Sequence, residues 1–151
     1  MSGALPDDRI RHLEMLQAAI TRMAGAAASI KSLGLVIAAG ALAFLATSPE
    51  PRIALAAAGL MLAFWLLDAR YLQQEKWFRD MFDLEQSLDA TTPASFVMTP
   101  SADIRARTSI RYGLISWSTW ALYGSLIAFL LILASVMAAS SSSAARACPH
   151  G

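Results

Sequence analysis

The sequence has little of what enzymes and disulfide-bonded proteins need. Only one of its 151 residues is cysteine, Cys148, which excludes an intrachain disulfide framework. Its two histidines, His12 and His150, lie near opposite ends of the chain, and no Cys/His cluster, glycine-rich phosphate loop or HExxH motif occurs. We therefore expect no enzymatic activity, no metal site, no cofactor and no nucleic-acid partner.

Charge is also scarce, and three stretches have none. Charged residues make up 15% of the chain and hydrophobic residues 56%, against averages of about 25% and roughly 45–50% in soluble domains. No charge occurs in residues 32–49, 53–67 or 112–145. A membrane span needs about 20 apolar residues, so the second stretch must extend into residues 68–71 as its interfacial end. The sequence predicts an all-α integral membrane protein with three transmembrane helices.

Two prolines separate the first two stretches. No helix can run through Pro49 or Pro51, because proline removes a backbone donor and clashes with the preceding turn. Apolar residues recur at spacings of three and four before the first stretch and after the second, with no breaker between. We expect one helix from about Asp7 to about Thr47 and a second that continues to about Leu88. Together they form a long hairpin that extends into the cytoplasm.

These signals divide the chain into six segments. Residues 1–31 are a cytoplasmic amphipathic helix continuous with span one, 32–67 the two-span hairpin and 68–89 a second cytoplasmic amphipathic helix. Residues 90–99 are a linker, 100–139 a third helix that contains span three, and 140–151 a disordered tail. Thr99 suits the N-cap of the third helix and Pro100 its first turn.

The basic residues predict the orientation. Ten of them fall before span one or between spans two and three, and two fall in the turn or the tail. The positive-inside rule then places the N-terminus in the cytoplasm and the C-terminus outside. Arg105, Arg107 and Arg111 at the start of the third helix suit anionic lipid headgroups, although the same residues are also explained by orientation alone.

Folding the chain back at Pro49 and Glu50 sets Lys31 opposite Asp68. We expect these two to form a structural ion pair at the cytoplasmic membrane surface, where pairing lowers the cost of a charge near hydrocarbon. The alternative is that each reaches water separately. Farther along the second helix, Glu75 and Arg79 have the favourable spacing of four for a surface pair.

The cytoplasmic part of the second helix has an apolar face too wide for one neighbour. This face implies a further helix, from this chain or from a second copy, and so favours self-association or a cytoplasmic protein partner. Its residues are Trp77, Phe78, Met81, Phe82, Leu84 and Leu88.

Hydroxyl groups recur at helical spacing in the third stretch. The residues are Thr108, Tyr112, Ser116, Thr119 and Tyr123. Such a stripe can line an aqueous path in an oligomer, with hydroxyls replacing water around an ion. Alternatively the hydroxyls hydrogen-bond the preceding carbonyls of their own helix or link neighbouring helices.

Residues 12–24, 29–34 and 64–79 carry a resemblance to known proteins. With the motif Leu67-Asp68-Ala-Arg-Tyr71-Leu-Gln-Gln-Glu75, they resemble a set of small uncharacterised bacterial membrane proteins with a two-span hairpin. The layout is similar to SLATT-type two-span effectors of conflict systems and, more loosely, to the membrane accessory protein of type VI-B CRISPR loci. The resemblance covers about the first 89 residues and implies a homo-oligomeric effector of bacterial antiviral defence that permeabilises the inner membrane.

Two functions follow from these features. The first is a homo-oligomeric inner-membrane ion channel, pore or membrane-perturbing effector. The alternative is a non-conducting scaffold or small accessory subunit of a larger membrane complex. The number of subunits distinguishes the two, since a protomer with three spans cannot enclose a channel alone.

Overall fold

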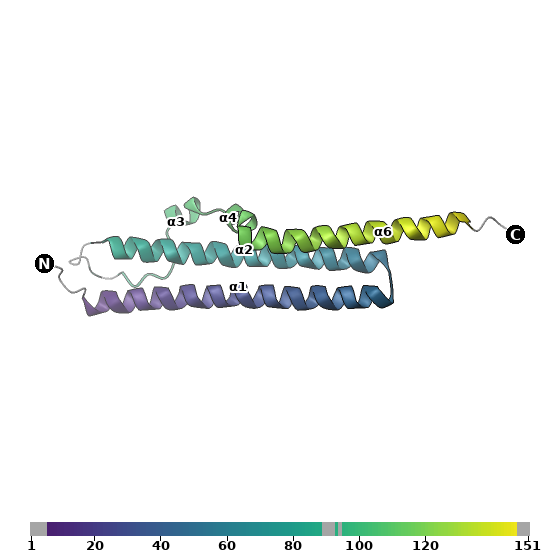
Figure 1. Ribbon diagram of the computed structural model, residues 1–151. Coiled ribbons are helices and arrows are strands. Elements are labelled where there is room, and N and C mark those ends of the chain that lie inside the picture. Colours follow the sequence, from purple (N-terminus) through teal and green to yellow (C-terminus); the bar gives the residue numbers. More distant parts are fainter. Residues whose placement is uncertain (1–5, 89–92, 94, 148–151) are drawn as a thin grey trace. The chain divides into compact units, whose positions relative to one another are not determined.

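The computed structural model describes residues 6–88, 93 and 95–147, with only the backbone described for 144–147. Within these residues every regular element is a helix (Figure 1). In order they are α1 (Asp7–Thr47), α2 (Pro51–Ser87), α3 (Ala102–Arg107), α4 (Ile110–Ile115), α5 (Trp117–Thr119), the π-helix η1 (Trp120–Gly124) and α6 (Ser125–Ala147). Three helical stretches are long and apolar enough to cross a membrane: Asp7–Thr47, Pro51–Ser87 and Trp117–Ser143.

Helices α1 and α2 begin where the sequence predicts, because residues in their first turns favour a helix start. Asp7 and Asp8 occupy the first turn of α1, where carboxylates interact favourably with the positive end of the helix dipole. Pro51 begins α2, a position where the missing proline N–H would have no helical partner in any case. The two helices are joined by residues 48–50.

Internal contacts divide the chain into two compact units. Unit 1 consists of residues 1–29 and 68–114, and unit 2 of residues 30–67 and 115–151. Both α1 and α2 therefore contribute one part to each unit. Each unit has its own hydrophobic cluster, and the two are described separately below.

Unit 2 has a core of mostly small side chains. Its buried residues are Ala38 and Leu45 of α1, Ala54, Ala57, Ala58 and Met61 of α2, and Leu130 and Ala134 of α6. Alanine lets helix backbones approach closely, which is how helices associate where lipid provides no hydrophobic drive. The outer surface of the unit is formed by large apolar side chains, among them Val36 (68% exposed), Ile132 (63%) and Val136 (60%).

Unit 1 has a core of larger side chains. Leu16, Met81 and Ile104 are buried, and Trp77, Phe78, Phe82 and Met98 pack against them. Four residues of the wide apolar face of α2 are therefore covered by α1, α3 and Met98 of the same chain. The further helix expected against this face is α3, whereas Leu84 and Leu88 stay exposed.

The prediction of a single third helix over residues 100–139 is wrong. The first helix after the linker is α3, whose N-cap is Ser101 instead of Thr99, with Ser101 Oγ accepting from Ile104 N at 3.3 Å. It ends at Arg107, and its C-cap Thr108 has the extended dihedrals φ −119° and ψ 97°. Gln73 of α2 donates to the Thr108 carbonyl at 2.9 Å, so a side chain of α2 satisfies the interrupted backbone.

The expected disordered tail is helical over its first part. Helix α6 continues to Ala147, through the four serines 140–143. Each serine hydroxyl donates to a carbonyl three or four residues earlier, at 2.8–3.0 Å. Because the serine hydroxyls bond to carbonyls of α6 itself, the serines do not favour a turn in place of the helix.

Candidate functional site

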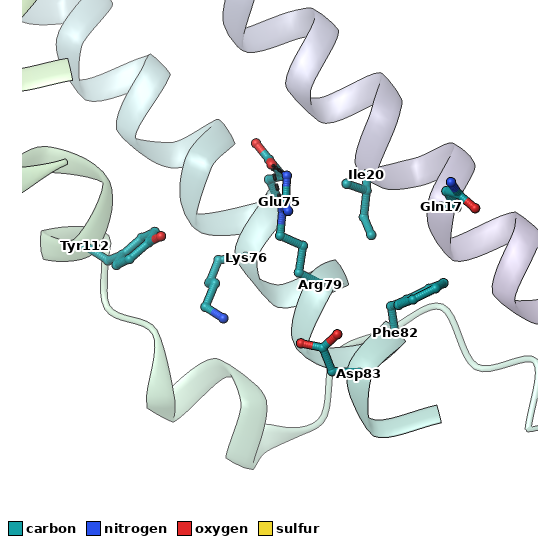
Figure 2. Close-up of a pocket in the computed structure, with 8 residues that line it drawn as sticks. All are labelled: Gln17, Ile20, Glu75, Lys76, Arg79, Phe82, Asp83 and Tyr112. Atoms are coloured by element: carbon teal, nitrogen blue, oxygen red, sulfur yellow. Dashed lines mark hydrogen bonds and ion pairs between the residues drawn. The ribbon is translucent and has the colours of Figure 1, made fainter. Parts of the chain in front are cut away.

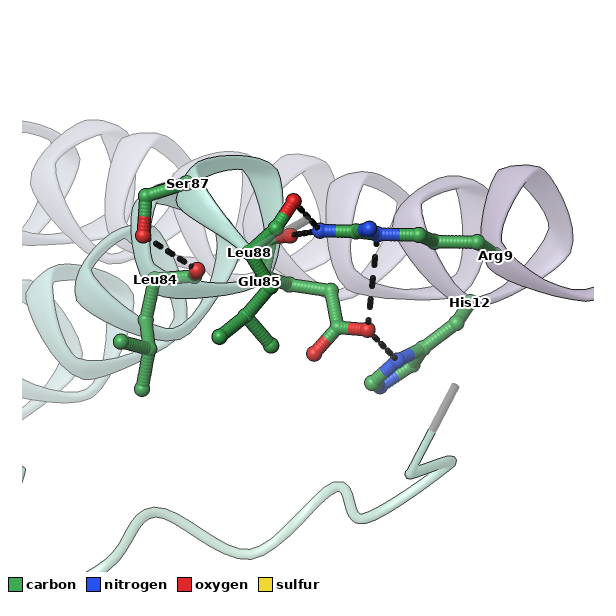
Figure 3. Close-up of polar contacts among 6 residues, drawn as sticks. All are labelled: Arg9, His12, Leu84, Glu85, Ser87 and Leu88. Carbon is green, nitrogen blue, oxygen red and sulfur yellow. Dashed lines mark hydrogen bonds and ion pairs between the residues drawn. The ribbon is translucent and has the colours of Figure 1, made fainter. Parts of the chain in front are cut away.

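A buried arginine joins the start of α1 to the end of α2 in unit 1. Arg9 is 1% exposed, and its Nη2 donates to the backbone carbonyls of Glu85 and of Leu88, the latter at 2.6 Å (Figure 3). The last carbonyls of a helix have no partner within it, and a cation interacts favourably with them. Arg9 therefore acts as the C-terminal cap of α2.

His12 and Glu85 complete a charged cluster around Arg9. The carboxylate Oε1 of Glu85 lies 3.5 Å from His12 Nδ1 and 4.0 Å from Arg9 Nε. His12 is 2% exposed and Glu85 7%. Figure 3 shows the imidazole and the guanidinium approaching the same carboxylate oxygen. Three ionisable groups can be buried together only if their charges balance one another, because an unpaired charge in the protein interior is costly.

A cavity of about 180 Å³ lies beside this cluster in unit 1. Its wall contains the apolar residues Leu16, Met81, Leu84, Val97 and Ile104 and the polar residues His12, Glu85, Ser95, Thr99 and Ser101. The ring of Phe96 packs on His12 with the ring centroids 5.5 Å apart. Phe96 also has a φ of 49°, a left-handed conformation that costs a non-glycine residue about 1–3 kcal/mol.

A larger and more open groove of about 680 Å³ also belongs to unit 1 (Figure 2). It is lined by Gln17, Ile20, Glu75, Lys76, Arg79, Phe82, Asp83 and Tyr112. Its charges are largely paired within α2: Arg79 Nη2 lies 2.6 Å from Glu75, which confirms the predicted pair, and Lys76 Nζ lies 2.5 Å from Asp80. The hydrogen bond to Asp80 raises the pKa of Lys76 above its usual value. The groove thus presents two ion pairs and, at Asp83, one further carboxylate.

The five predicted stripe residues are divided between the two units. Thr108 and Tyr112 belong to unit 1, where Thr108 is buried and Tyr112 is 55% exposed. Ser116, Thr119 and Tyr123 belong to unit 2, where Ser116 is half-buried and the other two are fully buried. Since helix breaks at Thr108 and Ser116 divide the segment, spacing alone no longer puts these hydroxyls on one helical face.

Two of these side chains have identified surroundings. Tyr123 lies in the π-helix η1 and stands against Gly34, where an added Cβ would be 3.5 Å from its ring. Thr119 Oγ1 donates to the Ser116 carbonyl at 2.9 Å, a bond within its own helical turn. The bond of Thr119 is of the kind that the alternative interpretation of the stripe expects, in which hydroxyls donate to preceding carbonyls of their own helix, whereas the contact of Tyr123 with Gly34 is one of packing.

The other predicted residues are placed as follows. Lys31 lies in unit 2 and is half-buried, and Asp68 lies in unit 1 and is fully buried. The ion pair between them stays a prediction. Arg105, Arg107 and Arg111 are all exposed in unit 1, as residues that bind headgroups must be. Cys148 and His150 lie outside the described residues. Within the described residues, no group of three or more potential metal ligands occurs.

Sequence reasoning missed the roles of Arg9, His12 and Glu85, although a signal was present. The buried face of α1 includes Arg9, His12, Leu16 and Ala19, at spacings of three, four and three. The apolar residues that recur at helical spacing before the first charge-free stretch begin at Leu13, because polar residues are not counted in a hydrophobic pattern. Extending the same period backwards from Leu16 leads to His12 and Arg9.

Comparison with known proteins gave no match to a family model, a curated protein or a solved structure. The resemblance to two-span conflict-system effectors therefore stays a prediction.

Proposed function

We propose that the chain is a non-conducting membrane scaffold or accessory subunit. In this proposal, α1 and α2 form a hairpin in the bacterial inner membrane, and residues 117–143 supply the third span. Unit 1 then lies in the cytoplasm with the N-terminus, and the C-terminus lies outside. The exposed apolar side chains of unit 2 support insertion, since a soluble protein seldom exposes so large an apolar surface.

The observation that carries the choice of scaffold over channel is the placement of the hydroxyl groups. A pore between subunits needs polar groups on the surface that the subunits share. In unit 2, Thr119 and Tyr123 are fully buried within the protomer. The hydroxyls of Ser125 and Ser135 are exposed, but each donates to the carbonyl four residues earlier, at 2.6 Å and 2.8 Å. Within residues 117–139, Ser118 is the one other exposed hydroxyl, so the surface of this stretch offers little polar lining for ions.

A homo-oligomeric channel is the second candidate, because of the π-helix η1. Such turns are rare and often occur at functional sites, and this one lies within the third apolar helical stretch, beside the half-buried Ser116. Assembly of several copies could bring Ser116 of each protomer to a common axis. This arrangement would correspond to the effector expected from the sequence.

The oligomeric state and ion flux distinguish the two candidates. We expect the full chain to purify in mild detergent as a monomer or dimer by native mass spectrometry and to give no ion flux in liposomes. A ring of several subunits with measurable flux would instead support the channel, provided that Ser116→Leu abolishes the flux. Ser118→Leu, a change of an exposed hydroxyl two residues away, is the matched control.

A further inference from the structure

Three exposed arginines of unit 1 lie ahead of the third apolar stretch. They are Arg105 and Arg107 in α3 and Arg111 in α4. Within the part of the chain that the structure describes, none of the three guanidinium groups forms an ion pair or a hydrogen bond. Asp103 stands four residues before Arg107, in the order that favours a pair, and these two described residues still form none. The three guanidinium groups are therefore free to bind a partner outside the chain.

The inward-facing residues of the same segment hold it in place. Ile104 is buried in the core of unit 1, and the carbonyl of Thr108 accepts from Gln73 of α2 at 2.9 Å. Gly113 stands so close to Ala69 that an added Cβ would collide with the backbone of α2. These fixed positions are interspersed with the arginines, so the segment presents its basic residues on a surface that is already ordered. Such a surface loses less conformational entropy when it binds a ligand.

The sequence places these arginines next to the third span of the proposed function. The apolar stretch begins at Trp117, six residues after Arg111 and twelve after Arg105. A fully extended chain covers at most about 3.6 Å per residue, so Arg111 lies within about 22 Å of Trp117. Trp117 is 79% exposed, which suits a side chain at the membrane interface. In an inserted protein, the arginines are therefore close to the lipid headgroups.

The chemistry of the surface favours phosphate. A guanidinium is planar, stays charged and presents its donors in a fork that matches two phosphate oxygens. Three arginines and Asp103 give residues 101–115 a net charge of +2. The surface therefore attracts an anionic headgroup more strongly than a zwitterionic one. Each basic residue near an anionic bilayer surface strengthens binding about fivefold.

We propose that Arg105, Arg107 and Arg111 form a binding surface for the phosphate group of an anionic phospholipid in the cytoplasmic leaflet. The guanidinium N–H groups donate to the phosphate oxygens, and the acyl chains of the lipid stay in the bilayer. The proposal rests on the proposed membrane insertion and orientation, which the scaffold and the channel share. It adds to them a lipid partner that the three arginines select by charge.

Native mass spectrometry of the full chain in mild detergent measures lipid binding. The protein is titrated with phosphatidylglycerol and, separately, with phosphatidylcholine of the same acyl chains. We expect phosphatidylglycerol to bind at least tenfold more tightly, because only this lipid carries a net negative charge. Equal binding of the two lipids would overturn the proposal. Displacement of phosphatidylglycerol by an equal concentration of inorganic phosphate would also overturn it, because the site would then take a free anion.

Two double variants test which arginines bind the lipid. Arg107→Gln/Arg111→Gln should weaken phosphatidylglycerol binding at least tenfold and leave phosphatidylcholine binding unchanged. Arg11→Gln/Arg22→Gln is the matched control, because these arginines of unit 1 are also exposed and form no ion pair with a described residue. At 1.5 Å per residue, they lie on α1 about 32 Å and about 15 Å before the first charge-free stretch.

The control should therefore change phosphatidylglycerol binding by less than about twofold. Equal weakening by the two double variants would show a general attraction between charges and would overturn the proposed surface. All four arginines are exposed, so neither variant should disturb the fold, which circular dichroism checks.

Flotation with vesicles separates a failure of this proposal from a failure of the proposed function. The full chain should float with vesicles of pure phosphatidylcholine and stay bound after an alkaline wash, because insertion needs only the apolar helices. A chain that floats in this way but binds both lipids equally would overturn the lipid surface and leave the proposed insertion in place. A chain that floats with neither phosphatidylcholine nor phosphatidylglycerol vesicles would overturn both.

Discussion

Arg9 shows how much one polar residue near the end of a chain can contribute to a fold. It caps the carbonyls of Glu85 and Leu88 and faces the Glu85 carboxylate in a buried setting. A lysine could supply the charge, but its ammonium lacks the planar set of donors that reaches two carbonyls and a carboxylate together. The Arg9 side chain therefore contacts Glu85 and Leu88, which lie 76 and 79 positions later in the sequence.

Removing Arg9 should destabilise the protein strongly. Arg9→Leu is expected to lower the free energy of unfolding by about 3–5 kcal/mol, because it leaves Glu85 as a buried charge without its balancing cation. Arg11→Leu, two residues away and exposed, should change it by less than about 0.5 kcal/mol. Chemical unfolding in detergent, followed by circular dichroism, measures both.

The double variant Arg9→Leu/Glu85→Leu identifies the cause of this loss. If the uncompensated carboxylate dominates, the double variant should be more stable than Arg9→Leu alone. If the double variant is no more stable, the loss comes from the missing cap of α2, and the charge balance described above is not the reason.

At the scale of elements, local signals predicted the long helices, and long-range contacts determined the rest. The bounds of α1 and α2 follow from Asp7, Pro49 and Pro51, which act within a turn of their own position. The helix break at Thr108 could not be predicted in the same way, because no proline or glycine lies there. It depends on Gln73, 35 residues earlier, which accommodates the free carbonyl. For the same reason the cluster of His12 and Glu85 could not be identified from spacing within one helix.

The packing of α4 on α2 depends on a single glycine. A Cβ added to Gly113 would lie 2.3 Å from the carbonyl oxygen of Ala69 and 2.8 Å from its Cα. Both are backbone atoms of a helix, so they cannot move aside as a flexible side chain would. The close approach of these two elements in unit 1 therefore excludes any side chain at position 113.

Gly113→Ala should accordingly lower the free energy of unfolding by about 1–3 kcal/mol, the usual cost of overpacking. The matched control is Gly25→Ala in α1 of the same unit, where an added Cβ meets nothing within 4 Å. This control should be neutral or up to about 1 kcal/mol more stable, because alanine favours the helix. Thermal unfolding of the two variants side by side is the measurement. Equal stabilities would show that α4 does not pack on α2 as described.

At the scale of the whole molecule, the membrane orientation is a property on which the proposed function depends. The residues that predict it are basic side chains on the segments flanking the apolar helices, and Arg105, Arg107 and Arg111 are all exposed, as the positive-inside rule and headgroup binding both require. Trp117 and Trp120 are 79% and 55% exposed, which suits side chains at a membrane interface. Tyr123, in contrast, is fully buried within unit 2 and therefore does not contribute to the interfacial aromatic side chains.

The single cysteine of the chain provides the test of orientation. Cys148 follows α6 and is predicted to lie outside the cell membrane, so a membrane-impermeant maleimide should label it in spheroplasts. In a Cys148→Ser/Ser109→Cys variant the thiol stands between α3 and α4, where we predict the cytoplasm, and labelling should require permeabilisation. Labelling of both thiols from outside would rule out a membrane crossing by residues 117–143, since the two cysteines flank only that stretch. The reverse pattern would place unit 1 outside, with its exposed arginines away from the cytoplasmic lipids that they are expected to contact.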